Sequence, residues 1–232
     1  MSGALPYFFI DDIAPVNQSQ VLPEETSKHV VQVLRMKVQE SLRLADGKGK
    51  LATAVITDDH KKKCMVTIVE IEENPLPATR HTIAISLLKN ATRFEWFLEK
   101  AAELGIGRIV PLLCARTEKQ HFRFERMKSI LTSAMLQSQQ SWLTELSEPI
   151  AFDKFLSSTE AAKAFIAHCE EGEKKSLFEL HDDASKIILI GPEGDFSPAE
   201  IEAAIAAGYQ PVTLGNTRLR TETAGVVAAT LL

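Results

Sequence analysis

Two short segments near the C-terminal end carry residue types that could bind a ligand and act on it. The first, Gly191-Pro192-Glu193-Gly194-Asp195-Phe196, directly follows the apolar run Ile187–Ile190. Glycine lets a ligand approach the backbone closely, Pro192 stiffens the turn, and Glu193 offers a carboxylate. An ordinary strand-to-helix turn explains the same residues equally well. The segment is not G-x-G-x-x-G, so it gives little support to a dinucleotide site.

The second segment, Leu214–Ala224, reads LGNTRLRTETA and combines two arginines, one glutamate and three threonines. Thr221 or Thr223 can cap the helix that follows. This many polar groups between an apolar strand and an apolar helix exceed what capping needs, which favours a binding or catalytic role. Both segments leave a strand, and open α/β sheets bind ligands at the carboxyl ends of their strands. We therefore expect the two loops to lie side by side at one sheet edge.

The elements that position these loops alternate between strands and helices over the C-terminal two thirds of the chain. The apolar pattern predicts strands at 81–88, 108–113, 162–169, 186–190 and 211–215, and helices at 93–104, 124–141, 198–208 and 221–232. Gly105 is expected to end the first helix, and Ser197 with Glu200 forms a capping box before the third. Such alternation indicates a parallel sheet covered on both faces, an α/β fold.

The N-terminal part has a different pattern, with short apolar runs between Tyr7 and Glu73. Its last two runs alternate apolar and polar residues, with turns at Asp46-Gly47 and Asp58–Lys63, which is typical of strands in a small barrel or sandwich. The sequence Asn74-Pro75-Leu76-Pro77 breaks both helix and strand and is the best linker in the chain. We predict two domains, 1–74 and 75–232.

Composition restricts the class of protein. The 232 residues are 45% apolar and 25% charged, as in an ordinary globular protein. Cys64, Cys114 and Cys169 stand far apart and the histidines are scattered, so neither a disulfide framework nor a metal site is expected. The start lacks a signal-peptide pattern and no run is long enough to cross a bilayer, so we expect a cytoplasmic protein without membrane contact.

The net charge of −5 argues against attraction of the whole molecule to nucleic acid. Local basic clusters remain, at Lys61–Lys63 and in the stretch from Arg116 to Lys128. On charge alone, solvated helix faces or hairpin tips are the simpler interpretation of these clusters.

Together these segments resemble a known family. GPEGDFS and LGNTRLRTETA, with LLKNATRFEWFLEKAAELGIGRIVPL and HVVQVLRMKVQESLRLADGKG before them, are similar to the ribosomal RNA small subunit methyltransferase E family over nearly the whole chain. The resemblance implies a small PUA-like β-barrel followed by a SPOUT-type parallel sheet with a trefoil knot that binds S-adenosyl-L-methionine. It also implies a homodimer that methylates N3 of one uridine in 16S ribosomal RNA of the small ribosomal subunit.

The resemblance also implies roles for individual residues. The expected cofactor-binding residues are Leu87, Ile190, Gly191, Pro192, Glu193, Gly194, Leu214, Gly215, Arg218, Leu219, Thr221, Thr223 and Ala224. The expected RNA-binding residues are Arg35, Lys37, Arg116, Arg123 and Arg126. At Gly194 we expect a side chain to fill space that the cofactor needs. Three positions depart from the family pattern: Leu136 replaces a glutamate, Gln140 an arginine, and Asp195 the last glycine of GPEGG.

Uracil N3 carries a proton that must leave before methylation, so the reaction needs a base or a group that stabilises the anion. Glu222 is the first candidate base and Glu193 the second, while Arg220 or Arg218 can stabilise the developing charge. A salt bridge that shapes the loop is an equally good interpretation of each arginine. The alternatives are a SPOUT methyltransferase with another RNA target and a non-catalytic RNA-binding or assembly protein. The last helix is apolar over more of its surface than one sheet face demands, which predicts contact with a second subunit.

Overall fold

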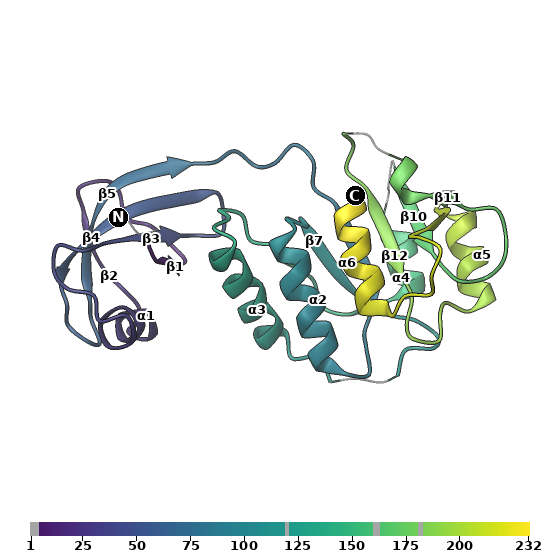
Figure 1. Cartoon of the computed structure of the whole chain (residues 1–232), viewed down its shortest axis with the longest axis horizontal. Helices are drawn as coiled ribbons and strands as arrows, with labels where there is room; N and C mark the ends of the chain where they lie inside the picture. The colour runs from purple at the N-terminus through teal and green to yellow at the C-terminus, as the bar shows by residue number, and fades with distance from the viewer. Residues whose placement is uncertain (1–4, 119–120, 160–162, 181–182) are drawn as a thin grey trace. The chain divides into compact units, whose positions relative to one another are not determined.

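The computed structural model describes residues 5–118, 121–159, 163–180 and 183–232, which form two compact units (Figure 1). The N-terminal unit comprises Met1–Leu76 and Met135–Leu143. The C-terminal unit comprises Pro77–Ala134 and Thr144–Leu232. The described part of the chain contains no helix that is long and apolar enough to span a membrane.

The N-terminal unit is built on a five-stranded sheet in the order β1-β3-β4-β5-β2. Its strands are β1 (Tyr7–Phe9), β2 (Ser19–Val21), β3 (Ser41–Ala45), β4 (Lys50–Asp58) and β5 (Met65–Glu73), and its helical segments are α1 (Glu24–Lys28) and η1 (His29–Val33). β1 pairs with β3 in parallel, and the other pairs are antiparallel. The two alternating sequence runs thus form neighbouring strands, as predicted.

The predicted turn at Asp46-Gly47 connects β3 to β4. Asp46 Oδ1 accepts hydrogen bonds from the backbone N–H groups of Lys48, at 2.7 Å, and Lys50, at 3.0 Å. Gly47 has φ +69°, a left-handed conformation that favours glycine. The side-chain bonds and the glycine together fix the register of the hairpin.

The segment Met135–Leu143 packs with the N-terminal unit although it lies far along the chain. Met135, Leu136 and Leu143 join Ala45 and Leu51 in one apolar cluster. Leu136, where the family pattern has a glutamate, is therefore half-buried against apolar neighbours. The sequence pattern did not predict this contact, because the segment reads as the end of a helix.

The C-terminal unit contains an eight-stranded sheet within the described residues, and every pair in it is parallel. The order is β11-β13-β10-β12-β6-β7-β8, with β9 also paired to β7. The strands are β6 (Thr82–Ser86), β7 (Arg108–Leu113), β8 (Glu145–Leu146), β9 (Ile150–Ala151), β10 (Ala164–Ala167), β11 (Lys175–Ser176), β12 (Ile187–Ile190) and β13 (Gln210–Thr213). The predicted parallel α/β sheet is confirmed.

Helices cover both faces of this sheet. The helical segments that follow β5 are α2 (Ala91–Glu103), α3 (Phe124–Gln137), α4 (Phe152–Ser158), the 3-10 helix η2 (Leu177–Glu179), α5 (Pro198–Ala206) and α6 (Thr221–Leu231), and four of them are assigned to a face below. Ala84 of β6 belongs to the same apolar cluster as residues of α4 and α5. The next residue, Ile85, faces α6, and α2 packs beside α6 (Figure 1). Successive strand residues point to opposite faces, so α2 and α6 cover one face and α4 and α5 the other.

The close approach of α6 to the sheet depends on Gly225. A Cβ atom at this position would lie 2.5 Å from Phe97 Cε2 of α2 and 2.9 Å from Ile85 Cδ1 of β6. Real Cβ atoms do not approach other atoms so closely, so only glycine fits here without displacement of Phe97 or Ile85. Gly225 thereby sets the position of the N-terminal turn of α6, which borders the site described below.

Several boundaries differ from the sequence predictions. α3 ends at Gln137 and not at Ser141, and Gln139 has φ +58°, which is incompatible with a continuing helix. Of the strand predicted at 162–169, residue 162 lies outside the described residues and β10 covers Ala164–Ala167. The predicted capping box of Ser197 and Glu200 is confirmed at α5, and Gly105, at φ +81°, follows the end of α2 as expected.

The prediction that Thr221 or Thr223 caps the last helix is wrong. α6 begins at Thr221, and its N-cap residue is Arg220, whose side chain makes no capping hydrogen bond. The N-cap position is therefore occupied by the residue before Thr221, and both threonines lie within the helix. The hydroxyl groups of the two threonines consequently do not cap α6.

Candidate ligand site at the carboxyl ends of three parallel strands

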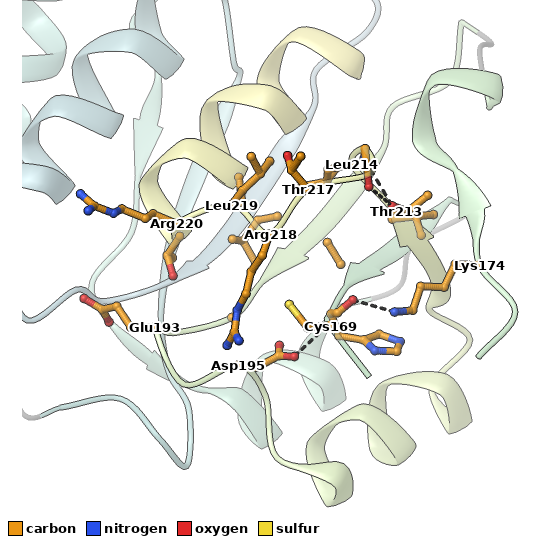
Figure 2. A pocket seen from close by; sticks show the side chains of 18 of the residues that line it. Cys169, Lys174, Glu193, Asp195, Thr213, Leu214, Thr217, Arg218, Leu219 and Arg220 are labelled. Atoms are coloured by element: carbon orange, nitrogen blue, oxygen red, sulfur yellow. Dashed lines mark hydrogen bonds between the residues drawn. The ribbon is translucent and has the colours of Figure 1, made fainter. Parts of the chain in front are cut away.

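A pocket of about 730 Å³ lies at the carboxyl ends of β10, β12 and β13 (Figure 2). β10 is the middle strand, and its last residue, Ala167, pairs with Ile190 of β12 and Val212 of β13. The residues around the pocket come from the loops that follow these strands and from the start of α6. They are Ala167, His168, Cys169, Lys174, Ile190, Gly191, Pro192, Glu193, Asp195, Val212, Thr213, Leu214, Gly215, Asn216, Thr217, Arg218, Leu219, Arg220, Thr221 and Ala224.

The structure thus brings together most of the cofactor-binding residues expected from the sequence. Three of them, Leu87, Gly194 and Thr223, are not among the pocket residues. A Cβ atom at Gly194 would lie 3.4 Å from Arg116 Cδ, an ordinary contact with a flexible side chain. The expectation that a side chain at Gly194 fills the ligand space has no support from this geometry.

The loop after β12 folds back on itself. Phe196 is fully buried and its ring lies 5.3 Å from that of Phe152. A Cβ atom at Gly191 would lie 3.1 Å from the backbone nitrogen and the ring of Phe196. Glycine at 191 therefore makes room for the fold-back of the loop, and the backbone of this loop faces the pocket.

Asp195 adopts φ +63°, which explains why the family pattern has glycine at this position. Its side chain makes two hydrogen bonds that accompany this conformation. Asp195 Oδ1 accepts from the backbone N–H of Phe196 at 2.8 Å. Oδ2 accepts from the backbone N–H of Cys169 at 2.7 Å, which connects the β12 loop to the β10 loop (Figure 2).

Arg116, which the sequence analysis assigned to RNA binding, contacts the same loop. Its Nη1 donates to the backbone oxygen of Gly194 at 2.7 Å and to that of Phe196 at 3.2 Å. The neighbouring backbone N–H of Ala115 donates to Glu200 Oε1 at 2.7 Å. The loop that follows β7 therefore braces the glycine-containing loop from the side away from β10.

The loop after β13 contributes backbone and charged side chains. Gly215 has φ +143°, and Thr213 Oγ1 donates to its backbone oxygen at 2.7 Å. Arg218 and Arg220 follow with exposed side chains that border the pocket. In Figure 2, Arg220 and Glu193 lie at one end of the pocket, and Thr213 lies at the other.

Glu222, the first candidate base, lies in the first turn of α6 but is not among the pocket residues. It is 6% exposed, and its Oε1 lies 3.6 Å from Arg93 Nε of α2. Its Oε2 is buried and has no hydrogen-bond partner in the described part of the chain. The structure therefore separates the two candidate bases, because Glu193 borders the pocket and Glu222 faces α2.

Sequence reasoning missed the loop after β10, which contributes His168, Cys169 and Lys174. Burial and the ammonium group of Lys174 lower the pKa of His168, so its imidazole is neutral at neutral pH. The signal was present, because a third predicted strand ended at these residues and parallel strands share their carboxyl edge. Across the described residues, no group of three or more metal-binding side chains is assembled.

The remaining candidate RNA-binding residues lie on the surface of both units. Arg35 is exposed at φ +58°, and Lys37 pairs with Asp59 at 3.3 Å. In the C-terminal unit Arg123 is exposed, and Arg126 Nη2 lies 2.9 Å from Glu95 Oε2. None of these four residues borders the pocket.

Comparison with known proteins defines the class of this protein. Residues 74–232 match the family model of an RNA methyltransferase domain, and residues 22–69 match that of an RNA methyltransferase PUA domain. The fold and the pocket described above thus belong to an RNA methyltransferase with a PUA domain. The chain is a member of the ribosomal RNA small subunit methyltransferase E family, which confirms the resemblance seen in the sequence.

Individual relatives support this assignment over most of their length. The ribosomal RNA small subunit methyltransferase E of Synechocystis is 31% identical over 209 residues, covering 86% of this chain and 68% of the relative. The crystal structure of a probable rRNA methyltransferase from Porphyromonas gingivalis is 39% identical with a TM-score of 0.90, covering 97% and 96% of the two chains. A ribosomal RNA small subunit methyltransferase E from Neisseria gonorrhoeae, crystallised with S-adenosyl methionine, is 28% identical with a TM-score of 0.89, covering 98% and 96%.

Proposed function

We propose that this chain transfers the methyl group of S-adenosyl-L-methionine to N3 of one uridine in 16S ribosomal RNA. The observation that carries the proposal is the pocket at the carboxyl ends of β10, β12 and β13 in a chain of this family. Its volume of about 730 Å³ suits a nucleoside-sized ligand. The relative from Neisseria binds the same cofactor.

The residues present fit the cofactor chemically. Ala167, Ile190 and Val212 supply apolar surface, while the loops after β12 and β13 supply backbone groups. The loop after β10 adds His168, whose buried ring nitrogens have no hydrogen-bond partner within the described residues. When bound, S-adenosylmethionine supplies an electrophilic methyl group on a sulfonium. The trefoil knot implied by the family resemblance forms the frame of this pocket in our proposal.

The protein side chains position the uracil and accept its N3 proton. Glu222 remains the proposed base although it faces α2, because its Oε2 has no hydrogen-bond partner within the described residues while Oε1 lies beside Arg93. Glu193, which borders the pocket, is the second candidate. Arg220, with Arg218 as the alternative, stabilises the negative charge that develops on the uracil oxygens. The target uridine must be unpaired or extruded, because base pairing hides N3.

The proposal extends to partners and location. The enzyme acts in the cytoplasm on 16S ribosomal RNA in the small ribosomal subunit, through a homodimer. Val226, Val227 and Ala229 of α6 are only partly buried within one chain, which leaves apolar surface for a second copy. The exposed basic residues Arg35 and Arg123 contact RNA phosphates.

Single-turnover methylation by purified variants tests the assignment of the base. Glu222→Gln is expected to keep the affinity for cofactor and RNA but to lower the rate on the order of a hundredfold, the usual effect of losing a positioned base. The defect should shrink as the pH rises, because alkaline solution deprotonates uracil without help. Glu193→Gln is the matched comparison. An unaltered rate in Glu222→Gln, together with a slow Glu193→Gln, would assign the base to Glu193.

Arg220→Lys separates charge stabilisation from proton transfer. A lysine ammonium does not reproduce the planar, two-pronged hydrogen bonding of a guanidinium. The variant should therefore stay slow across the whole pH range in which Glu222→Gln recovers. Recovery of Arg220→Lys at high pH would contradict the assigned role.

A further inference from the structure

Phenylalanines and basic residues alternate at the start of α3. In the sequence His121-Phe122-Arg123-Phe124, the two phenylalanine side chains are half-buried and the other two side chains are exposed. Lys128 is also exposed and lies one helical turn beyond Phe124. We call Phe122, Arg123, Phe124 and Lys128 the aromatic–basic patch. All four residues belong to the C-terminal unit, and none of them borders the pocket.

Packing against the buried core of the unit holds the two rings of the patch in place. Phe94 of α2 is buried, and its ring lies 5.9 Å from that of Phe97, which is also buried. The ring of Phe122 lies 6.2 Å from that of Phe94, and the ring of Phe124 lies 6.3 Å from that of Phe122. A row of rings thus runs from the core to the surface. Because the outer two rings are already held, little side-chain freedom is lost when a ligand packs against them.

The charge around the rings is positive although the chain as a whole is acidic. Between residues 121 and 128, Arg123, Arg126 and Lys128 outnumber the one acidic residue, Glu125, whereas the whole chain has a net charge of −5. Arg126 is paired with Glu95. The exposed side chains of Arg123 and Lys128 make no ion pair within the described residues. Both cations can therefore bind the phosphate groups of a nucleic acid.

Half-exposed aromatic rings beside such cations match the chemistry of a single-stranded nucleic acid. An aromatic ring stacks against the face of any base, and arginine or lysine binds the neighbouring phosphate. A base inside a duplex stacks on its neighbours instead, so the rings favour unpaired nucleotides. The proposed substrate provides such nucleotides, since a uridine whose N3 is accessible is not base-paired.

Two contacts connect the patch to the proposed site of the reaction. Arg116, in the same connection between β7 and α3, donates to the backbone of the loop after β12. Arg93, the neighbour of Phe94 on α2, has its Nε 3.6 Å from Oε1 of Glu222 on α6. Within the C-terminal unit, α2 lies between α3 and α6 (Figure 1). RNA that extends from the pocket across the first turns of α6 and α2 reaches the patch.

We infer that Phe122 and Phe124 form a stacking platform for unpaired nucleotides beside the target uridine, and that Arg123 and Lys128 bind the phosphates of these nucleotides. The inference rests on the proposed function, because it takes 16S ribosomal RNA as the ligand. It goes beyond the basic stretch seen in the sequence, since it assigns the binding of bases to two phenylalanines and separates it from the binding of phosphates.

Filter binding of purified 16S ribosomal RNA to the full-length protein, over a series of salt concentrations, tests the platform. Phe122→Leu and Phe124→Leu keep apolar side chains at the half-buried positions but remove the rings. We expect each variant to bind about fivefold to thirtyfold more weakly, the effect of losing one stacked base. The slope of log affinity against log salt should remain that of the wild type, because no cation is lost. Arg123→Ala should instead reduce that slope by about one.

The controls separate stacking from folding. Phe122→Tyr retains a ring and should bind RNA as the wild type does. Phe178→Ala removes an exposed phenylalanine of the same unit that lies outside the patch, and it should leave the RNA affinity unchanged. The affinity for S-adenosylhomocysteine, measured by calorimetry, should equal that of the wild type in both leucine variants, since the patch does not border the pocket.

The outcomes are distinct. Wild-type RNA affinity of both leucine variants would overturn the platform. An equal loss in Phe122→Tyr and Phe122→Leu, or a parallel loss of S-adenosylhomocysteine affinity, would assign the effect to packing and would also overturn it. Unchanged RNA affinity with a changed molar mass in light scattering would show that the patch contacts a second copy of the chain instead. A wild-type protein that does not bind 16S ribosomal RNA would contradict the proposed function itself.

Discussion

Replacing Arg116 tests whether this residue braces the cofactor loop or binds RNA. Arg116→Ala removes two hydrogen bonds, of 2.7 Å to the backbone oxygen of Gly194 and 3.2 Å to that of Phe196. Each such bond contributes about 0.5–1.5 kcal/mol, and the exposed position of Arg116 favours the lower half of that range. The pair therefore stabilises the loop by about 1–2 kcal/mol.

The same loop forms one wall of the pocket. We therefore expect the stabilisation that the loop loses in Arg116→Ala to weaken the free energy of ligand binding by the same amount. A change of about 1–2 kcal/mol corresponds to an affinity for S-adenosylhomocysteine that is about five- to thirtyfold weaker. Isothermal titration calorimetry at fixed salt and pH measures this affinity directly. Arg126→Ala is the matched control, because it removes the same charge from the same basic stretch but breaks only a surface ion pair with Glu95.

The interpretation of Arg116 as an RNA ligand gives the opposite pattern. A phosphate contact contributes to RNA affinity and to its salt dependence, and its loss lowers the slope of log affinity against log salt by about one. Unchanged affinity for S-adenosylhomocysteine in Arg116→Ala, combined with that change in salt slope, would refute the bracing role. It would support the assignment made from the sequence.

Two further predictions concern packing and thiol chemistry. Gly225→Ala places a Cβ atom 2.5 Å from Phe97 Cε2 and should lower the free energy of unfolding by about 1–3 kcal/mol, as measured by urea denaturation. Stability equal to that of the wild type would contradict the close packing of α6. Burial raises the pKa of Cys64 to about 11 and that of Cys114 to about 12, so both remain protonated at pH 8 and should resist a thiol reagent in the native state. The exposed Cys169 should react rapidly and be protected by S-adenosylhomocysteine, and equal labelling of all three thiols would contradict this.

The alternation of apolar segments predicted the fold of the C-terminal unit well, because a buried parallel strand has a nearly continuous apolar sequence. Ile187–Ile190 and the capping box at Ser197 are examples in which local sequence is sufficient. The segment Met135–Leu143 could not be assigned in this way. Its packing against Ala45 and Leu51 depends on tertiary contacts between distant parts of the chain, which no local pattern encodes.

The candidate site was predictable to the same extent. Glycine and proline in the loop after β12, and the dense polar residues after β13, indicate a site because their types are unusual for plain turns. His168 was missed because a single histidine has no distinctive spacing, and its position at the end of a third predicted strand was the only signal. The role of Arg116 was missed because its two acceptors are backbone oxygens 78 and 80 positions away, and only the folded chain brings them together.

The central claim is that this chain methylates N3 of a uridine in 16S ribosomal RNA, and nucleoside analysis of that RNA tests it most directly. RNA is taken from a strain that lacks the gene, from the same strain after return of the wild-type gene, and from one that carries Glu222→Gln. We predict that 3-methyluridine is absent from 16S RNA in the first strain, is restored in the second, and is strongly reduced in the third. Undiminished 3-methyluridine in the strain without the gene, or loss of a different methylated nucleoside, would contradict the claim.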